Sequence, residues 1–312
     1  MGILTQACGP LRYDEVENPQ PSPPFYLPDN IRVALVLGSG GVRGMAHVGV
    51  IEELVAAGIE FDLIVGCSAG SIVGALYADH PDIELLKKSI WDIRAHSLLD
   101  FDISDCRYGL YQSRALHTVL DSYLHADRFE DLKIPLVIVA SDLHSGECVP
   151  IGGGELVPAV QSSCSIPLVF APCDHLNRAL VDGGVINPVP AKVAGDLGAQ
   201  YVIAVDLSEL LDQTEPTNLF QVASRSMEIA FMWQNQACAR YADVVIRPKT
   251  CGVGTFNDKM KELLYEAGKQ AAREKIPEIK ASIAALELEK RVECGWRLVE
   301  PTCYTPQIYL SD

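Results

Sequence analysis

The sequence predicts an α/β fold with three layers: a mostly parallel central sheet that has helices on both faces. Two observations predict it. Short apolar segments of strand length alternate along the chain with segments of helical periodicity, and glycine clusters directly follow the first two apolar segments. With 312 residues, of which 48% are hydrophobic, the chain is large enough to bury one substantial core.

The alternation begins at residue 31. Ile31–Leu37 is apolar apart from Arg32, which is typical of a parallel strand buried on both faces of a sheet. Met45–Ala57 follows with helical spacing, and Phe61–Val65 is a second strand that leads into a helix of small residues ending near Ala78. We expect further strands at 135–140, 179–181, 201–207 and 243–247, and further helices at 82–133, 156–164, 219–239 and 257–292. The last is a charged amphipathic helix interrupted near Pro277, and we interpret its charge run from Lys259 to Glu274 as a solvated face.

Composition excludes several classes of function. The formal net charge of −16 argues against a nucleic-acid partner and against electrostatic attraction to anionic membranes. No stretch approaches the roughly 18 apolar residues of a membrane span. The ten cysteines include no C-x-x-C pair, so we expect no metal and no cofactor, with Cys67 and Cys164 as buried thiols. Cys294 and Cys303 would be able to pair in an exported protein.

The N-terminal residues 1–30 are polar and rich in proline, as in a semi-rigid tether. Within them, Ile3–Gly9 resembles the end of a bacterial lipoprotein signal whose cysteine, here Cys8, is acylated. The charged and apolar regions that precede such a site are missing from this sequence. A cytoplasmic N-terminus and a membrane anchor through Cys8, made from a longer precursor, therefore both stay open.

A candidate nucleophile lies at the end of the second predicted strand. Gly66-Cys67-Ser68-Ala69-Gly70 fits G-x-S-x-G between a strand and a helix. In this context the turn is so sharp that glycines must flank it, and the serine hydroxyl is exposed above the sheet. The helix N-terminus behind Ser68 favours developing negative charge, and the N–H of Ala69 is placed to bind an oxyanion. The alternative is a glycine turn that only permits close strand–helix packing.

A glycine loop, Gly38-Ser39-Gly40-Gly41-Val42-Arg43-Gly44, lies between the first strand and its helix. Successive glycine N–H groups can form an anion-binding nest, which would serve either as an oxyanion hole for Ser68 or as a nucleotide phosphate loop. The nucleotide interpretation is disfavoured. No Lys-Ser or Lys-Thr closes the loop, Arg43 replaces the third glycine of G-x-G-x-x-G, and no acidic residue ends the second strand.

Asp182-Gly183-Gly184, after a short apolar strand, is by itself only a turn signal. The order G-x-G-G-x-R-G, then G-x-S-x-G, then D-G-G resembles the patatin-like phospholipase family, in its bacterial and neuropathy-target-esterase-like branch. His47-Val48-Gly49-Val50 and Ser165-Ile166-Pro167 support the resemblance, which covers roughly residues 31–210.

The resemblance implies a patatin-like α/β fold and hydrolysis of acyl esters by a Ser–Asp dyad that needs no histidine, metal or cofactor. It makes Ser68 the nucleophile and Asp182 the general base, with Gly40, Gly41, Arg43 and Ala69 forming the oxyanion hole. Ser39 stands where many relatives carry glycine, which leaves open the choice of oxyanion donors. The remaining motif glycines are Gly38, Gly44, Gly66, Gly70, Gly183 and Gly184.

The histidines offer a check on the dyad, because an α/β-hydrolase triad runs Ser, acid, His along the chain. That order would require Ser68, Asp142 and His175, yet nothing around His175 marks it as catalytic, and we interpret it as a polar loop residue. We expect His47 to pack or hydrogen-bond locally. The alternative to a hydrolase is a nucleotide-binding or non-catalytic regulatory protein that uses the same glycine loops.

The resemblance also suggests how the chain is divided. We expect a tether at residues 1–30, a catalytic domain at 31–250, and a helical extension at 251–312 that packs on it. The expected partners are a lipid or long-chain ester and the membrane or micelle surface that contains it. The sequence does not indicate the head group, the acyl chain or the position cleaved.

Overall fold

The structure, a computed structural model, describes residues 19–94, 114–208, 215–250, 258–289, 296–301 and 303. Its centre is an eight-stranded sheet in the order β6-β7-β4-β3-β2-β8-β9, with β5 also paired to β4. The pairs among β4, β3, β2, β8 and β9 are parallel, and those of β4, β5, β6 and β7 with one another are antiparallel. The strands are β2 (Ile31–Leu37), β3 (Leu63–Cys67), β4 (Leu136–Asp142), β5 (Cys148–Ile151), β6 (Cys173–His175), β7 (Arg178–Asp182), β8 (Ala199–Val205) and β9 (Val244–Ile246).

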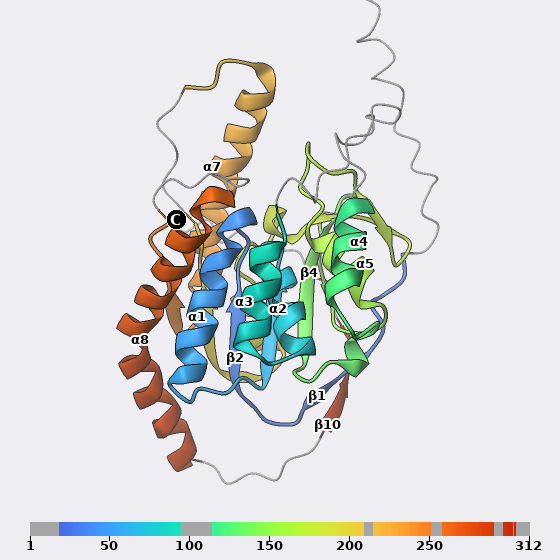
Figure 1. The fold of residues 1–312 in the computed structure, drawn as a ribbon. Coiled ribbons are helices and arrows are strands. Elements are labelled where there is room, and N and C mark those ends of the chain that lie inside the picture. The colour runs from blue at the N-terminus through green and yellow to red at the C-terminus, as the bar shows by residue number, and fades with distance from the viewer. Residues whose placement is uncertain are drawn as a thin grey trace, which may run out of the picture.

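Helices cover both faces of this sheet, which confirms the predicted three-layer α/β architecture (Figure 1). The alternation of side chains along β2 shows the two layers: Leu35 and Leu37 belong to one apolar cluster, and Ala34 and Val36 belong to the other. The first cluster packs under α1 (Met45–Ala56), α2 (Ala69–Asp79), α3 (Ile83–Asp92), α4 (Arg114–Tyr123), α5 (Leu156–Ser163) and α8 (Lys261–Glu289). The second packs under α6 (Ala191–Asp196) and the end of α7 (Leu219–Ala239).

Helix α8 lies along α1 (Figure 1), and glycines let the two backbones approach closely. A Cβ on Gly49 would lie 2.2 Å from the carbonyl oxygen of Tyr265, and one on Gly268 would lie 2.1 Å from that of Ala46. The predicted interruption near Pro277 is wrong, because α8 continues through it to Glu289. Ile279 beyond the proline is fully buried, so packing offsets the hydrogen bond that proline cannot donate.

The interpretation of the charge run from Lys259 to Glu274 as a solvated helix face does not hold for Lys261. Lys261 is buried, and its ammonium donates hydrogen bonds to the carbonyl oxygens of Ile90, Trp91 and Ile93 at the end of α3. Cationic groups are favourable at this end of a helix, where carbonyl groups lack partners. Part of the charged run therefore joins α8 to α3.

Four strands were not predicted, and two of them form a separate sheet. The antiparallel pair of β1 (Phe25–Pro28) and β10 (Trp296–Val299) brings together segments from the two ends of the chain. Phe25 and Leu27 are buried, so this part of the Pro-rich N-terminal segment packs on the fold. The expected helical region at 82–133 contains α3, α4 and a short 3-10 turn at Phe129–Asp131, and residues 95–113 lie outside the described residues.

Within the described ranges, no helix combines the length and the apolar character that crossing a bilayer requires. Cys8 and Cys294 lie outside the described residues. Cys67 and Cys164 are buried free thiols, as predicted, and burial raises the pKa of each above its ordinary value.

Candidate active site

Ser68 occupies a strained turn between β3 and α2. Its backbone has φ 53° and ψ −121°, a conformation that residues with a Cβ rarely adopt. Two glycines make the turn sterically feasible, because a Cβ on Gly66 would lie 2.7 Å from Cα of Ser71 and one on Gly70 would lie 2.0 Å from the carbonyl oxygen of Leu37. The G-x-S-x-G segment therefore forms the predicted sharp elbow, with α2 beginning directly after the serine.

The Ser68 hydroxyl donates a hydrogen bond of 2.6 Å to Oδ2 of Asp182. Both residues are buried, each with 4% of its surface exposed. The other carboxylate oxygen, Oδ1, accepts a 2.7 Å hydrogen bond from the N–H of Gly184. Burial raises the pKa of Asp182 to about 6, although the hydrogen bonds from Ser68 and Gly184 oppose this increase. The carboxylate is thus ionised at neutral pH and aimed at the serine.

Asp182 is held at the end of β7 by backbone and side-chain contacts. Its N–H donates to the carbonyl oxygen of Ser165 (3.0 Å), and its own carbonyl oxygen accepts from the hydroxyl of Ser141 (2.9 Å). The next residue must be glycine, since a Cβ on Gly183 would lie 2.3 Å from the carbonyl oxygen of Val139. The D-G-G motif therefore presses against β4, and this contact fixes the direction of the carboxylate.

The structure also reveals Ser163, which the sequence analysis did not single out. Its hydroxyl accepts a hydrogen bond from the N–H of Ser68 (2.9 Å) and donates one to the carbonyl oxygen of Val139 (2.7 Å). Ser163 is buried and therefore fixes the elbow against β4. The only signal in the sequence was a run of small polar residues just before Ser165-Ile166-Pro167, which says nothing about a partner 95 residues away.

Several polar groups of the glycine loop are already engaged within the fold. The N–H of Gly38 donates to the carbonyl oxygen of Val205 (3.1 Å), and the N–H of Ser39 donates to that of Pro188 (2.8 Å). The carbonyl oxygen of Gly40 accepts two hydrogen bonds from Arg43, one from its N–H (3.2 Å) and one from its Nε (3.0 Å). Among the described residues, none accepts a hydrogen bond from the N–H of Gly40 or Gly41. Gly41 has a φ of +57°, which favours glycine.

The three motifs meet in space. A Cβ on Gly44 would lie 3.1 Å from Cβ of Ala69, so the glycine loop touches the first residue of α2. A Cβ on Gly184 would lie 3.4 Å from both side-chain atoms of Ser39, so the D-G-G segment touches the same loop. The loop after β2, the elbow after β3 and the end of β7 thus surround Ser68 together, although they are far apart in the chain.

Among the residues that the structure describes, no histidine contacts the dyad. His175 lies in β6 and pairs with Arg178, roughly 13 Å along β7 from Asp182 at strand spacing. It is therefore a strand residue and not the loop residue that we expected. Burial lowers its pKa, and its Nε2 has no partner among the described residues. Asp142, the acid of the conventional triad, instead accepts a 2.5 Å hydrogen bond from Arg178.

His47 makes the local contact that we expected. Its Nε2 lies 2.8 Å from the carbonyl oxygen of Gly38, and burial lowers its pKa to about 4, so the ring is neutral at physiological pH. Because a carbonyl only accepts, Nε2 carries the proton in this contact. His47 thereby supports the first glycine of the loop from α1.

One cluster with metal-ligand chemistry was not foreseen, namely Asp79, His80 and His125. The Asp79 carboxylate lies 3.6 Å from Nδ1 of His80 and 3.4 Å from Nδ1 of His125. Asp79 ends α2 whereas Ser68 precedes it, so the cluster is about 16 Å from the elbow by helical rise. It is therefore too distant to take part in chemistry at Ser68.

Comparison with known proteins identifies a family to which the sequence is similar. A family model described as patatin-like phospholipase matches residues 35–194, a stretch that contains all three motifs. An uncharacterized NTE family protein of Mycobacterium tuberculosis is 36% identical over 179 residues, which cover 57% of this chain and 49% of that protein. Human patatin-like phospholipase domain-containing protein 6 is 33% identical over 193 residues, covering 59% of this chain and 14% of that protein.

The chain spans about half the length of the mycobacterial relative and a smaller part of the human one. Among solved structures, VipD from Legionella pneumophila superposes with a TM-score of 0.55 at 13% identity, covering 83% of this chain and 70% of that chain, which shows a shared fold. The family model accounts for slightly more than half of the 312 residues, so the chain belongs to the patatin-like phospholipase family.

Proposed function

We propose that this protein is a serine hydrolase that cleaves the acyl esters of phospholipids or lysophospholipids through a dyad of Ser68 and Asp182. The observation that carries the proposal is the 2.6 Å hydrogen bond from the Ser68 hydroxyl to the Asp182 carboxylate, at a strained elbow between strand and helix. A nucleophile in hydrogen-bond contact with an oriented base is the arrangement that covalent catalysis requires.

In the proposed mechanism, Asp182 removes the hydroxyl proton as Oγ of Ser68 attacks the ester carbonyl. The tetrahedral intermediate collapses to an acyl-enzyme, and the departing alkoxide takes the proton from Asp182 to leave as an alcohol. A water molecule then gives a proton to Asp182 and attacks the acyl-enzyme. Collapse of the second intermediate releases the fatty acid, and Ser68 regains its proton. The hydrogen bond from Gly184 keeps Oδ2 directed at Ser68 throughout.

The oxyanion would be bound by the N–H groups of Gly40, Gly41 and Ala69. Support comes from the hydrogen bonds of the surrounding backbone, because the N–H groups of Gly38, Ser39 and Ser68 are already engaged elsewhere. We assign Arg43 a positioning role, since its Nε holds the carbonyl oxygen of Gly40. Each lost oxyanion donor typically costs roughly 3–4 kcal/mol of transition-state stabilisation.

The same hydrogen bonds disfavour a nucleotide phosphate loop. The first two N–H groups of the glycine loop, those of Gly38 and Ser39, donate to carbonyl oxygens and are not available to bind an anion. The substrate class is proposed from the family, whose description names phospholipase, and from the human relative, whose name does the same.

The decisive experiment is labelling with a fluorophosphonate probe, followed by analysis of products from a panel of phospholipids and lysophospholipids. We expect covalent modification at Ser68 in the wild type and none in Ser68→Ala, with release of free fatty acid by the wild type only. His175→Ala is the matched control and should label normally. Labelling that persists in Ser68→Ala would contradict the assignment of the nucleophile.

A further inference from the structure

Helix α7 has an exposed apolar face that packing on the fold does not explain. The helix extends well beyond the other helices near the sheet (Figure 1). Four of its large apolar side chains are exposed: Leu219 (85%), Val222 (47%), Ile229 (39%) and Trp233 (64%). We call these four residues the α7 apolar face. Scattered apolar side chains are normal on a protein surface, but four on one helix call for a cause.

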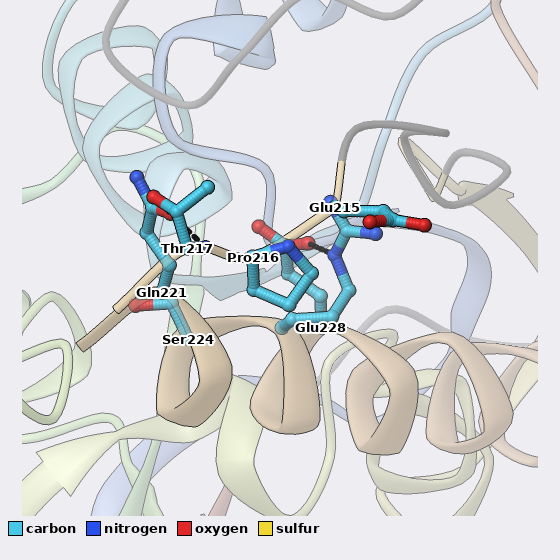
Figure 2. A pocket seen from close by; sticks show the side chains of 7 residues that line it. Glu215, Pro216, Thr217, Gln221, Ser224 and Glu228 are labelled. Carbon is cyan, nitrogen blue, oxygen red and sulfur yellow. Dashed lines mark hydrogen bonds and ion pairs between the residues drawn. The ribbon is translucent and has the colours of Figure 1, made fainter. Parts of the chain in front are cut away.

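The four residues lie on one side of the helix. At about 100° per residue they fall within an arc of roughly 80°. Ser226 and Ala237 also fall within this arc, and Ala230 lies at its border, so this side of the helix carries no charge. A different flank of α7 is polar. Gln221, Arg225 and Glu228 line a pocket of about 280 Å³, in which Arg225 pairs with Glu228 at 3.0 Å; Figure 2 shows Gln221 and Glu228 on the helix. The exposed part of α7 is therefore amphipathic.

Two contacts, one before α7 and one at its C-terminal end, lie close to the candidate active site. Before α7, Leu207 contacts the glycine loop, since a Cβ on Gly40 would lie 2.8 Å from its side chain. At the end of α7, Cys238 lies 4.0 Å from the carbonyl oxygen of Ile186, shortly after the D-G-G motif. Because α7 follows β8 and precedes the parallel strand β9, it starts at the carboxyl edge of the sheet, where Ser68 also lies.

We propose that the α7 apolar face docks onto the surface of a lipid bilayer or micelle and holds the Ser68 edge of the sheet against it. This inference rests on the proposed lipid substrate, which resides in such aggregates. Charge complementarity favours this occupant: a chain of net charge −16 gains little from anionic head groups, whereas an uncharged face suits a zwitterionic surface. Tryptophan among aliphatic residues is typical of helices that lie in the membrane interface.

The test measures flotation of the full chain with vesicles of ether-linked phosphatidylcholine, which contain no acyl ester to hydrolyse. Trp233→Gln should weaken vesicle binding about tenfold or more, which corresponds to about 1.4 kcal/mol. Trp296→Gln is the matched control, because Trp296 is equally exposed (66%) but lies in β10, at the opposite end of the molecule from α7 in Figure 1. The control should bind vesicles like the wild type.

Activity measurements separate this inference from the proposed function. On a soluble short-chain ester, Trp233→Gln and the control should both have the activity of the wild type. On vesicles of ester-linked phospholipid, only Trp233→Gln should lose activity, by the same factor as its loss of vesicle binding. Wild-type protein that hydrolyses the soluble ester but does not float would overturn the docking proposal alone. Equal vesicle binding by the two variants would also overturn the docking proposal. The same holds if light scattering shows that the wild type is a dimer and that Trp233→Gln dissociates it. Binding without labelling at Ser68 would instead overturn the proposed function.

Discussion

Replacement of Asp182 by asparagine should abolish activity and, at the same time, stabilise the fold. Asparagine has the same shape, so its Oδ1 can accept from the N–H of Gly184, and its Nδ2 can donate to the Ser68 hydroxyl. It cannot accept the serine proton. We therefore expect turnover to fall by roughly 10²–10⁴-fold, the range typical for loss of a general base.

The stabilisation follows from the pKa of Asp182, which burial raises from 3.8 to about 6. Between these two pH values the folded protein binds the proton more tightly than the unfolded chain, so the free energy of unfolding falls as pH rises across this window. At about 1.4 kcal/mol per pH unit, the ionised carboxylate costs about 3 kcal/mol at neutral pH. Asp182→Asn should recover up to this amount.

The assay is chemical denaturation of both proteins at a series of pH values from 4 to 8, beside ester hydrolysis. Near pH 4 the two free energies of unfolding should be similar, and at pH 7.5 the variant should be more stable. His175→Ala, which alters a histidine that does not contact the dyad, should keep near-normal turnover. An active Asp182→Asn enzyme beside an inactive His175→Ala enzyme would refute the dyad, and equal stability of wild type and Asp182→Asn at pH 7.5 would refute the energetic argument.

Four further predictions concern the same site. In the wild type, kcat/KM should rise with pH through about 6 as Asp182 ionises, and a flat profile from pH 5 to 8 would contradict its role as base. Ser68→Gly should be more stable than Ser68→Ala by about 1 kcal/mol in thermal unfolding, because glycine tolerates a φ of 53°. If the alanine variant is instead the more stable of the two, the elbow is not strained. Ser163→Ala should lower the free energy of unfolding by roughly 1–3 kcal/mol and should also lower turnover, because it leaves the N–H of Ser68 without its partner. Ser122→Ala, on an exposed turn of α4, is the control. Gly41→Ala should lower kcat more than it raises KM, because the φ of +57° resists a Cβ. Gly146→Ala, with a φ of +71° in the turn between β4 and β5, should affect stability but not kcat.

Local patterns allowed much of the fold to be predicted. Strands β2, β3, β4, β7, β8 and β9 were expected from apolar runs, because a parallel strand covered on both faces has no polar side to interrupt the pattern. Strands β1, β5, β6 and β10 were missed, since all are three or four residues long. In addition, β1 and β10 pair with each other across almost the whole length of the chain. The continuity of α8 through Pro277 was also missed, because its cause is packing against α1.

The family, the order of the three motifs and the candidate pair of Ser68 and Asp182 could all be predicted from the amino-acid sequence. Sharp glycine turns after apolar strands are local features, so residue types and spacing are enough to reveal them. Only the tertiary structure decided that the two side chains meet, that Ser163 holds the elbow, and which N–H groups of the glycine loop are engaged. It also decided the pKa of Asp182 and the exposure of α7. The physical reason is that burial and hydrogen-bond partners depend on residues far away in the chain, and no local pattern encodes them.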